Sequence, residues 1–342
     1  MRRDNTIDLF RGIAALSIVI IHTAFWSGSS YVPPIIQSLT LLIDVPLFMF
    51  ISGMTYNFSN SLQKNIKGLI TIWKKYLIFL IPYFIISYVM DPSYLSLKEI
   101  INSIFFSSSV ESPLQVVPGS IWFIFMFFTV SLISSIIITI YNKYNDNLDN
   151  FKNIILVSFI LYGMSVYNKE FIFLNTCNLL YIFIYLLGYY LYNKKFKTIW
   201  DYLFVLFFNI DILIFMLLFG DYGVTNIQGA KFDYSITYLL WSSMSIATVA
   251  YLKDRIKFNC KFLNWIGKNA IIFYFGQGIS SSLIGYAIKN ITLSYLPKFI
   301  IACIINLILS ILISFILLRY INLIENLLKK NKFKILIVDK ES

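Results

Sequence analysis

Charged residues are scarce in this chain. Asp, Glu, Lys and Arg together make up 13% of its 342 residues, which is roughly half of their share in an average soluble domain. Hydrophobic residues make up 58%, and the mean hydropathy is +0.74. This composition argues against a soluble domain and indicates an all-α integral membrane protein with several spans.

Cysteine and histidine, which hold most metal sites, are also scarce. Cys177, Cys260 and Cys303 stand alone in the sequence, and His22 is the only histidine. Without a CxxC pair or a histidine near any cysteine, neither a disulfide framework nor a zinc site is indicated. We therefore expect three packed thiols and no bound metal.

Acidic residues are fewer than basic ones, 17 against 28, so the net charge is +11. In a soluble protein such an excess would suggest nucleic acid as a partner. Here the basic residues lie between apolar runs, where they orient a membrane protein in the bilayer. We expect the lipid bilayer as a partner, and no nucleic acid.

Ten apolar segments are long enough to cross the hydrocarbon core, which takes about 20 helical residues. They cover residues 7–26, 35–58, 69–90, 118–142, 152–168, 170–192, 200–220, 232–252, 265–288 and 297–320. We interpret the first as a retained helix, because no convincing signal-peptide cleavage site follows it. The predicted organisation is one transmembrane domain, residues 1–328, and a short basic tail, residues 329–342.

The distribution of basic residues between the loops indicates which way these ten spans are oriented in the membrane. The orientation with both termini in the cytoplasm places most lysines and arginines in inner loops, as membrane proteins prefer. The inner set is then Arg2, Arg3, Lys64, Lys67, Lys74, Lys75, Lys143, Lys152, Lys194, Lys195, Lys197, Lys253, Arg255, Lys257, Lys261 and the tail lysines, and the outer set is Lys98, Lys169, Lys231, Lys289 and Lys298. We expect a multi-pass protein of the cell membrane with both termini inside.

Four ionisable residues lie within or at the ends of the apolar segments, where charge is costly and each such group is a candidate for function. They are Arg11, His22, Asp44 and Asp211. Arg11 could simply extend to the headgroups, and Asp211 could serve a structural hydrogen bond. Asp44 stands just before Pro46, where a broken helix would expose backbone groups.

Arg11 and His22 share the first predicted span, eleven positions apart. On a helix, eleven steps leave them about 20° apart around the axis and about 16 Å apart along it. One face would then carry a cation for phosphates at the inner end and an imidazole, the natural general base near neutral pH, further out. A cytosolic acyl-coenzyme A fits this spacing, although a histidine hydrogen-bonded between helices fits it as well.

Four motifs resemble the acyltransferase-3 family of integral membrane O-acyltransferases. They are Arg11 and His22 in "LFRGIAALSIVIIHTAF", then "VPLFMFISGMTY" (45–56), "SIWFIFMFF" (120–128) and "WIGKNAIIFYFGQ" (265–277), which occur in the family's order. The resemblance implies about ten helices and transfer of an acyl group, commonly acetyl, from acyl-coenzyme A as donor. The implied acceptor is a hydroxyl of a cell-envelope glycan or lipid-linked sugar, at the bacterial plasma membrane.

The same resemblance suggests roles for several residues. His22 would be the catalytic base and Arg11 the donor-binding residue, while Ser52 and Trp122 lie in motifs that would contact substrate. Two positions depart from the family: Lys74 and Lys75 replace an arginine pair, and Gln277 replaces a late histidine. We expect these lysines to bind the donor and Gln277 to orient a hydroxyl. Because a catalytic base is commonly oriented by a hydrogen bond to a further side chain, we expect Asp44 to orient His22.

Two other interpretations remain open from the sequence. In a proton-coupled transporter or flippase of a glycan or small metabolite, His22, Asp44 and Asp211 would form a proton relay. Against it, the sequence shows no paired broken helices and no symmetry between its halves. A purely structural membrane protein would leave the four ordered motifs unexplained. The oligomeric state is not indicated.

Overall fold

The computed structural model describes residues 4–59, 61–94, 96–105, 111–145, 147–168, 175–256 and 258–341, the last eleven of them as backbone only. The described chain is helical throughout and contains no strand. Its helices are α1 (Asn5–His22), α2 (Pro34–Thr40), α3 (Val45–Ser59), α4 (Leu62–Met90), α5 (Leu97–Phe105), α6 (Val116–Tyr144), α7 (Phe151–Tyr167), α8 (Thr176–Tyr192), α9 (Ile199–Phe219), α10 (Ile227–Phe232), α11 (Ile236–Leu252), α12 (Lys261–Lys268), α13 (Ala270–Ile288) and α14 (Tyr295–Glu341). The expected all-α membrane fold is confirmed at this level.

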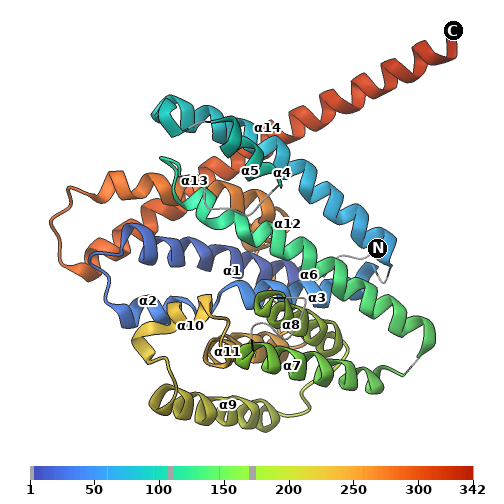
Figure 1. The fold of residues 1–342 in the computed structure, drawn as a ribbon, viewed down its shortest axis with the longest axis vertical. Helices are drawn as coiled ribbons and strands as arrows, with labels where there is room; N and C mark the ends of the chain where they lie inside the picture. Colours follow the sequence, from blue (N-terminus) through green and yellow to red (C-terminus); the bar gives the residue numbers. More distant parts are fainter. Residues whose placement is uncertain are drawn as a thin grey trace.

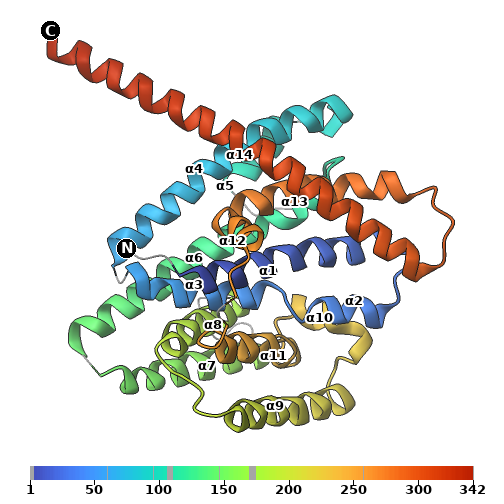
Figure 2. The ribbon, with the colours of Figure 1, turned by 180° about the vertical axis from the view of Figure 1, so that it is seen from behind.

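Helix α1 lies in the middle of the bundle, between α12 and α13 on one side and α3 on the other (Figures 1 and 2). Glycines allow its close approach to α12. A Cβ atom on Gly12 would overlap the carbonyl of Leu263, and one on Gly267 would overlap the carbonyl of Asp8. Small residues of this kind let membrane helices pack backbone against backbone, and here they fix the inner half of α1.

Helices α3 and α8 cross in the same manner. A Cβ atom on Gly53 would overlap the carbonyl of Tyr185, and one on Gly188 would overlap the carbonyl of Phe50. The crossing holds the second family-like motif, which α3 carries, against the core of the bundle. The position of Ser52 beside α1 therefore depends on a glycine that the motif supplies.

Two of the predicted spans are broken. The segment 35–58 divides into α2 and α3, and Asp44 lies in the break just before α3, as Pro46 indicated. The second break, between α10 and α11, bends the chain by 104°. It contains neither proline nor glycine, and instead Tyr234 adopts a left-handed φ of 51°. The sequence therefore gave no signal for this second break.

Each predicted span overlaps a helix of the described chain, but not every one meets the length expected of a full crossing. Among the described residues, seven helical segments are long and apolar enough, or eight if the bent α10–α11 pair is counted as one span. Helices α7 and α8 have 17 residues each. The count of ten and the orientation of the termini stay predictions; Arg2, Arg3, Lys169 and Lys257, which contributed to the charge bias, lie outside the described residues.

The margin of the bundle is strongly apolar. Helix α9 exposes Phe204, Phe207, Phe208 and Phe215 at the edge of the fold (Figure 1). In a membrane protein such side chains face lipid, which is their favourable solvent. Helix α14 continues as helix past residue 329, where the sequence analysis placed the start of the tail, and projects away from the bundle (Figures 1 and 2).

Candidate active site

Arg11 and His22 lie on one continuous helix, as their spacing indicated. The α-helix ends at His22, and the chain continues as a π-helical turn, Thr23–Ser27. Eleven residues of α-helix separate the two Cα atoms by about 16 Å along the axis. π-Helical turns often accompany functional sites, because they re-aim the side chains around them. Here the turn begins directly after the histidine.

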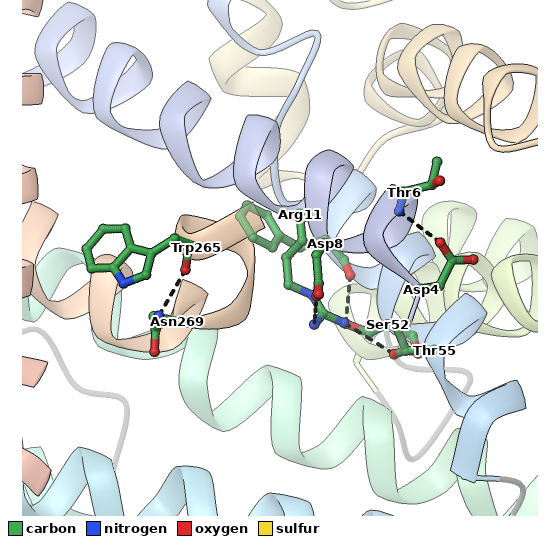
Figure 3. A network of polar contacts seen from close by, with 9 residues as sticks. Asp4, Thr6, Asp8, Arg11, Ser52, Thr55, Trp265 and Asn269 are labelled. Carbon is green, nitrogen blue, oxygen red and sulfur yellow. Dashed lines mark hydrogen bonds and ion pairs between the residues drawn. The ribbon is translucent and has the colours of Figure 1, made fainter. Parts of the chain in front are cut away.

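Arg11 extends from α1 toward α3 (Figure 3). One guanidinium nitrogen lies 3.9 Å from the Asp8 carboxylate, and another donates a hydrogen bond of 3.4 Å to the Thr55 hydroxyl. About a quarter of the side chain, 24%, is exposed. Arg11 is therefore held in place from two helices while part of its cationic group remains accessible.

A cavity of about 410 Å³ opens beside Arg11, and we call it the Arg11 cavity. Three lysines from two other helices line it together with Arg11: Lys64, Lys75 and Lys268. Lys74 does not line it and is exposed on the other side of α4. Of the two lysines expected to bind the donor, only Lys75 is thus brought to Arg11, and Lys268 joins it from a motif to which no binding role had been given.

His22 lines a second cavity, of about 290 Å³, which we call the His22 cavity. Its wall includes Asp44, Trp122, Lys231 and Tyr274. These residues come from five separate segments of the chain, so the site exists only in the folded bundle. His22 therefore faces open space and is not sealed in packing between helices.

Gln277, not Asp44, holds the ring of His22. The ring Nδ1 lies 2.8 Å from the Gln277 side-chain oxygen. When this amide oxygen accepts the hydrogen bond, Nδ1 carries the proton and Nε2 keeps its lone pair. Gln277 is fully buried and accepts a second hydrogen bond from the Ser281 hydroxyl. The glutamine is therefore placed to orient the imidazole, and its burial keeps it from a substrate hydroxyl.

The support behind Gln277 continues to α14. The Asn306 amide donates hydrogen bonds of 3.0 Å to Ser281 and 2.9 Å to the Thr23 hydroxyl. Thr23 follows His22 in the chain, so these bonds form a buried polar cluster around the histidine. Buried polar clusters of this kind fix a side chain when their members are hydrogen-bonded.

Asp44 has different partners. Its Oδ2 atom lies 2.8 Å from the Lys231 ammonium and accepts a hydrogen bond of 2.7 Å from the Tyr238 hydroxyl. Its Oδ1 atom is buried and has no hydrogen-bond partner among the described residues. A carboxylate with 1% exposure requires a counter-charge. That requirement was a signal for a basic partner, but the position of Lys231, in a predicted outer loop, did not identify it as the partner.

Tyr274 separates the two cavities and lines both. Its hydroxyl donates a hydrogen bond of 2.7 Å to the backbone carbonyl of Ser120, and its ring packs on that of Phe123 with the centroids 5.0 Å apart. Arg11 and His22 therefore line two cavities that meet at one aromatic side chain.

A third cavity, of about 430 Å³, lies next to the His22 cavity, and we call it the outer cavity. Trp122 and Phe232 line both of these cavities. The remainder of its wall is mixed polar and aromatic and includes Asn175, Asn178 and Tyr234. These three residues lie toward the ends of spans that the charge bias places outside, whereas Phe125, Met126 and Thr129 extend the wall toward the middle of α6.

The other predicted site residues lie in different places. Ser52 lines the Arg11 cavity and donates its hydroxyl to the Phe48 carbonyl. Asp211 is exposed on α9 and lines none of the three cavities, so a proton relay of His22, Asp44 and Asp211 finds no support. The three cysteines are free thiols. Within the described ranges no three acidic, histidine or cysteine side chains gather as metal ligands.

Comparison with protein families also indicates an acyltransferase. The family model described as an acyltransferase domain matches residues 4–315, which contain Arg11, His22, Lys231 and Gln277. Comparison with curated proteins and with solved structures gave no match. Because the family model covers most of the chain, this multi-pass membrane protein belongs to the acyltransferase-3 family.

Proposed function

We propose that the protein is a bacterial plasma-membrane O-acyltransferase. It moves an acyl group, acetyl in the simplest case, from cytosolic acyl-coenzyme A to a hydroxyl of a cell-envelope carbohydrate. The observation that carries the proposal is the arrangement along α1. Arg11 lines a cationic cavity, His22 lines the adjoining one, and Tyr274 stands where the two meet.

The donor occupies the Arg11 cavity. Arg11, Lys64, Lys75 and Lys268 line it. In the predicted orientation Lys64 and Lys75 belong to an inner loop, and Arg11 and Lys268 lie at the inner ends of their spans, on the side of the membrane where coenzyme A is found. Arginine suits phosphate groups because its planar guanidinium can donate two parallel hydrogen bonds, and lysines add point charges. The pantetheine arm then extends along α1 past Tyr274 and brings the thioester to His22.

His22 acts as the general base of the transfer. Gln277 holds the proton on Nδ1, so Nε2 accepts the proton of the acceptor hydroxyl. The hydroxyl oxygen attacks the thioester carbon and forms a C–O bond. The C–S bond then breaks, and the sulfur of coenzyme A takes the proton back from the imidazolium. The products are an ester and free coenzyme A.

Lys231 stabilises the oxyanion that forms during this attack. It lies in the wall of the His22 cavity, and Asp44 holds it there at 2.8 Å. A fixed positive charge in a site of low dielectric lowers the energy of a developing negative charge. Two other polar residues lie elsewhere: Ser52 lines the Arg11 cavity and Asn178 the outer cavity.

Replacing His22 with alanine tests the proposal. Purified wild-type protein and His22→Ala are incubated with labelled acetyl-coenzyme A and a panel of methyl glycosides, and ester formation is measured. We expect kcat to fall by about a hundredfold to ten-thousandfold, the range for loss of a general base. Binding of coenzyme A and elution as a single species should be unchanged. Full transfer activity in His22→Ala would overturn the mechanism.

A further inference from the structure

We propose that the outer cavity is the acceptor site and that it binds a sugar ring. The inference rests on the proposed function, because it assigns the second substrate of the same reaction to a place in the fold. The cavity, at about 430 Å³, lies within the roughly 300 to 1,000 Å³ of small-molecule sites. It shares Trp122 and Phe232 with the His22 cavity and no lining residue with the Arg11 cavity, so donor and acceptor reach the His22 cavity past different side chains.

The polar part of the wall suits hydroxyl groups. The side-chain amide of Asn178 is partly buried and has no hydrogen-bond partner in the part of the chain that the structure describes. An amide offers both a donor and an acceptor, as a ring hydroxyl requires. Asp233, which already accepts a hydrogen bond from the Tyr222 hydroxyl, adds a carboxylate at the rim.

The apolar part of the wall is aromatic. Trp122, Phe232 and Tyr234 line the cavity from α6 and from the bend between α10 and α11. Aromatic side chains combine a large apolar face with a polar edge or group. A pyranose ring has the complementary character, with C–H bonds on its faces and hydroxyls around its rim. An acyl chain or a purely ionic ligand would not use both parts of this wall.

The outer cavity adjoins the His22 cavity at two side chains. Trp122 and Phe232 line it and the His22 cavity alike. A ring held between them and Asn178 presents one hydroxyl toward Nε2 of His22. Trp122, expected from the sequence to contact substrate, thus stands at the junction of acceptor and base.

The bend between α10 and α11 positions Phe232 at this junction. Tyr234 has a left-handed φ of 51°, which is strained for a bulky residue. The turn is fixed by a 2.9 Å hydrogen bond from the Tyr162 hydroxyl to the Tyr234 carbonyl. Irregular backbone at membrane depth is tolerated where it lines a cavity. The same bend carries Lys231, so the acceptor wall and the oxyanion-stabilising charge are parts of one rigid turn.

A kinetic experiment separates this site from the rest of the reaction. Asn178→Ala is compared with Asn290→Ala, the same change at an exposed position that lines none of the cavities. The acceptor probes are methyl β-glucoside and its 2-acetamido analogue, with acetyl-coenzyme A as donor. We expect the KM for the glycoside to rise about tenfold in Asn178→Ala, with the KM for acetyl-coenzyme A unchanged and Asn290→Ala like wild type. An unchanged glycoside KM in Asn178→Ala would overturn the assignment.

A labelling experiment needs no catalysis. In a chain freed of Cys177, Cys260 and Cys303, single cysteines are placed at Thr129, which lines the outer cavity, or, as the control, at the exposed Thr225. Saturating methyl glycosides should slow methanethiosulfonate labelling of Thr129→Cys several-fold and leave Thr225→Cys unaffected. Equal labelling rates with and without every glycoside would refute the sugar site even if acyl transfer is observed. Protection without any acyl transfer would support the site and refute the proposed function instead.

Discussion

The two cavities along α1 differ in how they hold their charged groups. The Arg11 cavity has four cations in its wall, and Lys64 and Lys268 are exposed. The His22 cavity is smaller, and its charged pair, Asp44 and Lys231, is buried. One cavity therefore attracts a polyanion through summed charge, whereas the other controls a few atoms through fixed hydrogen bonds.

This difference predicts how each cavity responds to mutation. Several cations contribute to binding of the donor, so the loss of one of them weakens that binding only in part. A buried ion pair or an orienting hydrogen bond has no such substitute, so removing one partner removes its entire contribution to stability or catalysis. We expect changes around His22 to lower kcat or stability, and changes around Arg11 to raise the KM for the donor.

Lys231→Met should have the largest effect on stability. It leaves Asp44 buried without its counter-charge, which costs about 3 to 5 kcal/mol. The double variant Lys231→Met, Asp44→Asn has no such charge and should regain most of that loss. Thermal unfolding in detergent measures both variants. If the single variant is as stable as wild type, the pair has no structural role.

Transfer should be lost in both of these variants, because each lacks the charge that stabilises the oxyanion. Activity of the double variant therefore separates the two roles of Lys231. A double variant that is stable and fully active would contradict the proposed catalytic role while leaving the structural role intact.

Arg11→Ala should raise the KM for acetyl-coenzyme A about tenfold to a hundredfold, the value of a lost hydrogen bond to a charged group. Higher salt should weaken donor binding in the wild type more than in the variant, because salt screens exposed charges. kcat should change little. A variant that lost kcat at an unchanged KM would place Arg11 in the chemical step instead.

Gln277→Leu should lower kcat about tenfold, since it removes one hydrogen bond that orients His22. Gln277→Glu keeps an acceptor at this position and should retain more activity than the leucine variant. The KM for acetyl-coenzyme A, which binds in the other cavity, should not change in either. Equal activities of Gln277→Leu and wild type would show that Gln277 does not position the base.

Lys75 and Lys74 offer a matched comparison, and here we expect the smallest change in the KM for the donor. Only Lys75 lines the Arg11 cavity. We expect Lys75→Ala to raise the KM for acetyl-coenzyme A about two- to fivefold, the scale of one exposed charge among several. Lys74→Ala should behave as wild type. A larger rise in KM for Lys74→Ala than for Lys75→Ala would mean that the donor lies on the side of α4 that faces away from the cavity.

Much of the fold followed from local pattern. The long apolar runs predicted the helices, and Pro46 indicated the break at Asp44. The spacing of Arg11 and His22 placed them on one face of α1, because helical geometry is local. The bend at Tyr234 was missed, since no glycine or proline marks it. It is stabilised by contacts from α7, which no local signal reveals.

The candidate site, like the fold, was predicted only in part. Arg11, His22 and Trp122 were identified from motifs, and the structure places each in the wall of a cavity. The partner of His22 was predicted to be Asp44, but the structure pairs the ring with Gln277. The choice depends on the packing of α1 against α13, across 255 positions of sequence.

By itself, the sequence determined that this chain is a helical membrane protein and that its only histidine shares a helix face with Arg11. Composition and helical periodicity are properties of short segments, so they can be deduced without the fold. Only the tertiary structure decided that Lys231 pairs with Asp44, that Gln277 orients the imidazole, and that Tyr274 divides the space between the cavities. Those outcomes depend on which helices pack together, because a buried charge or ring takes its partner from its neighbours in space.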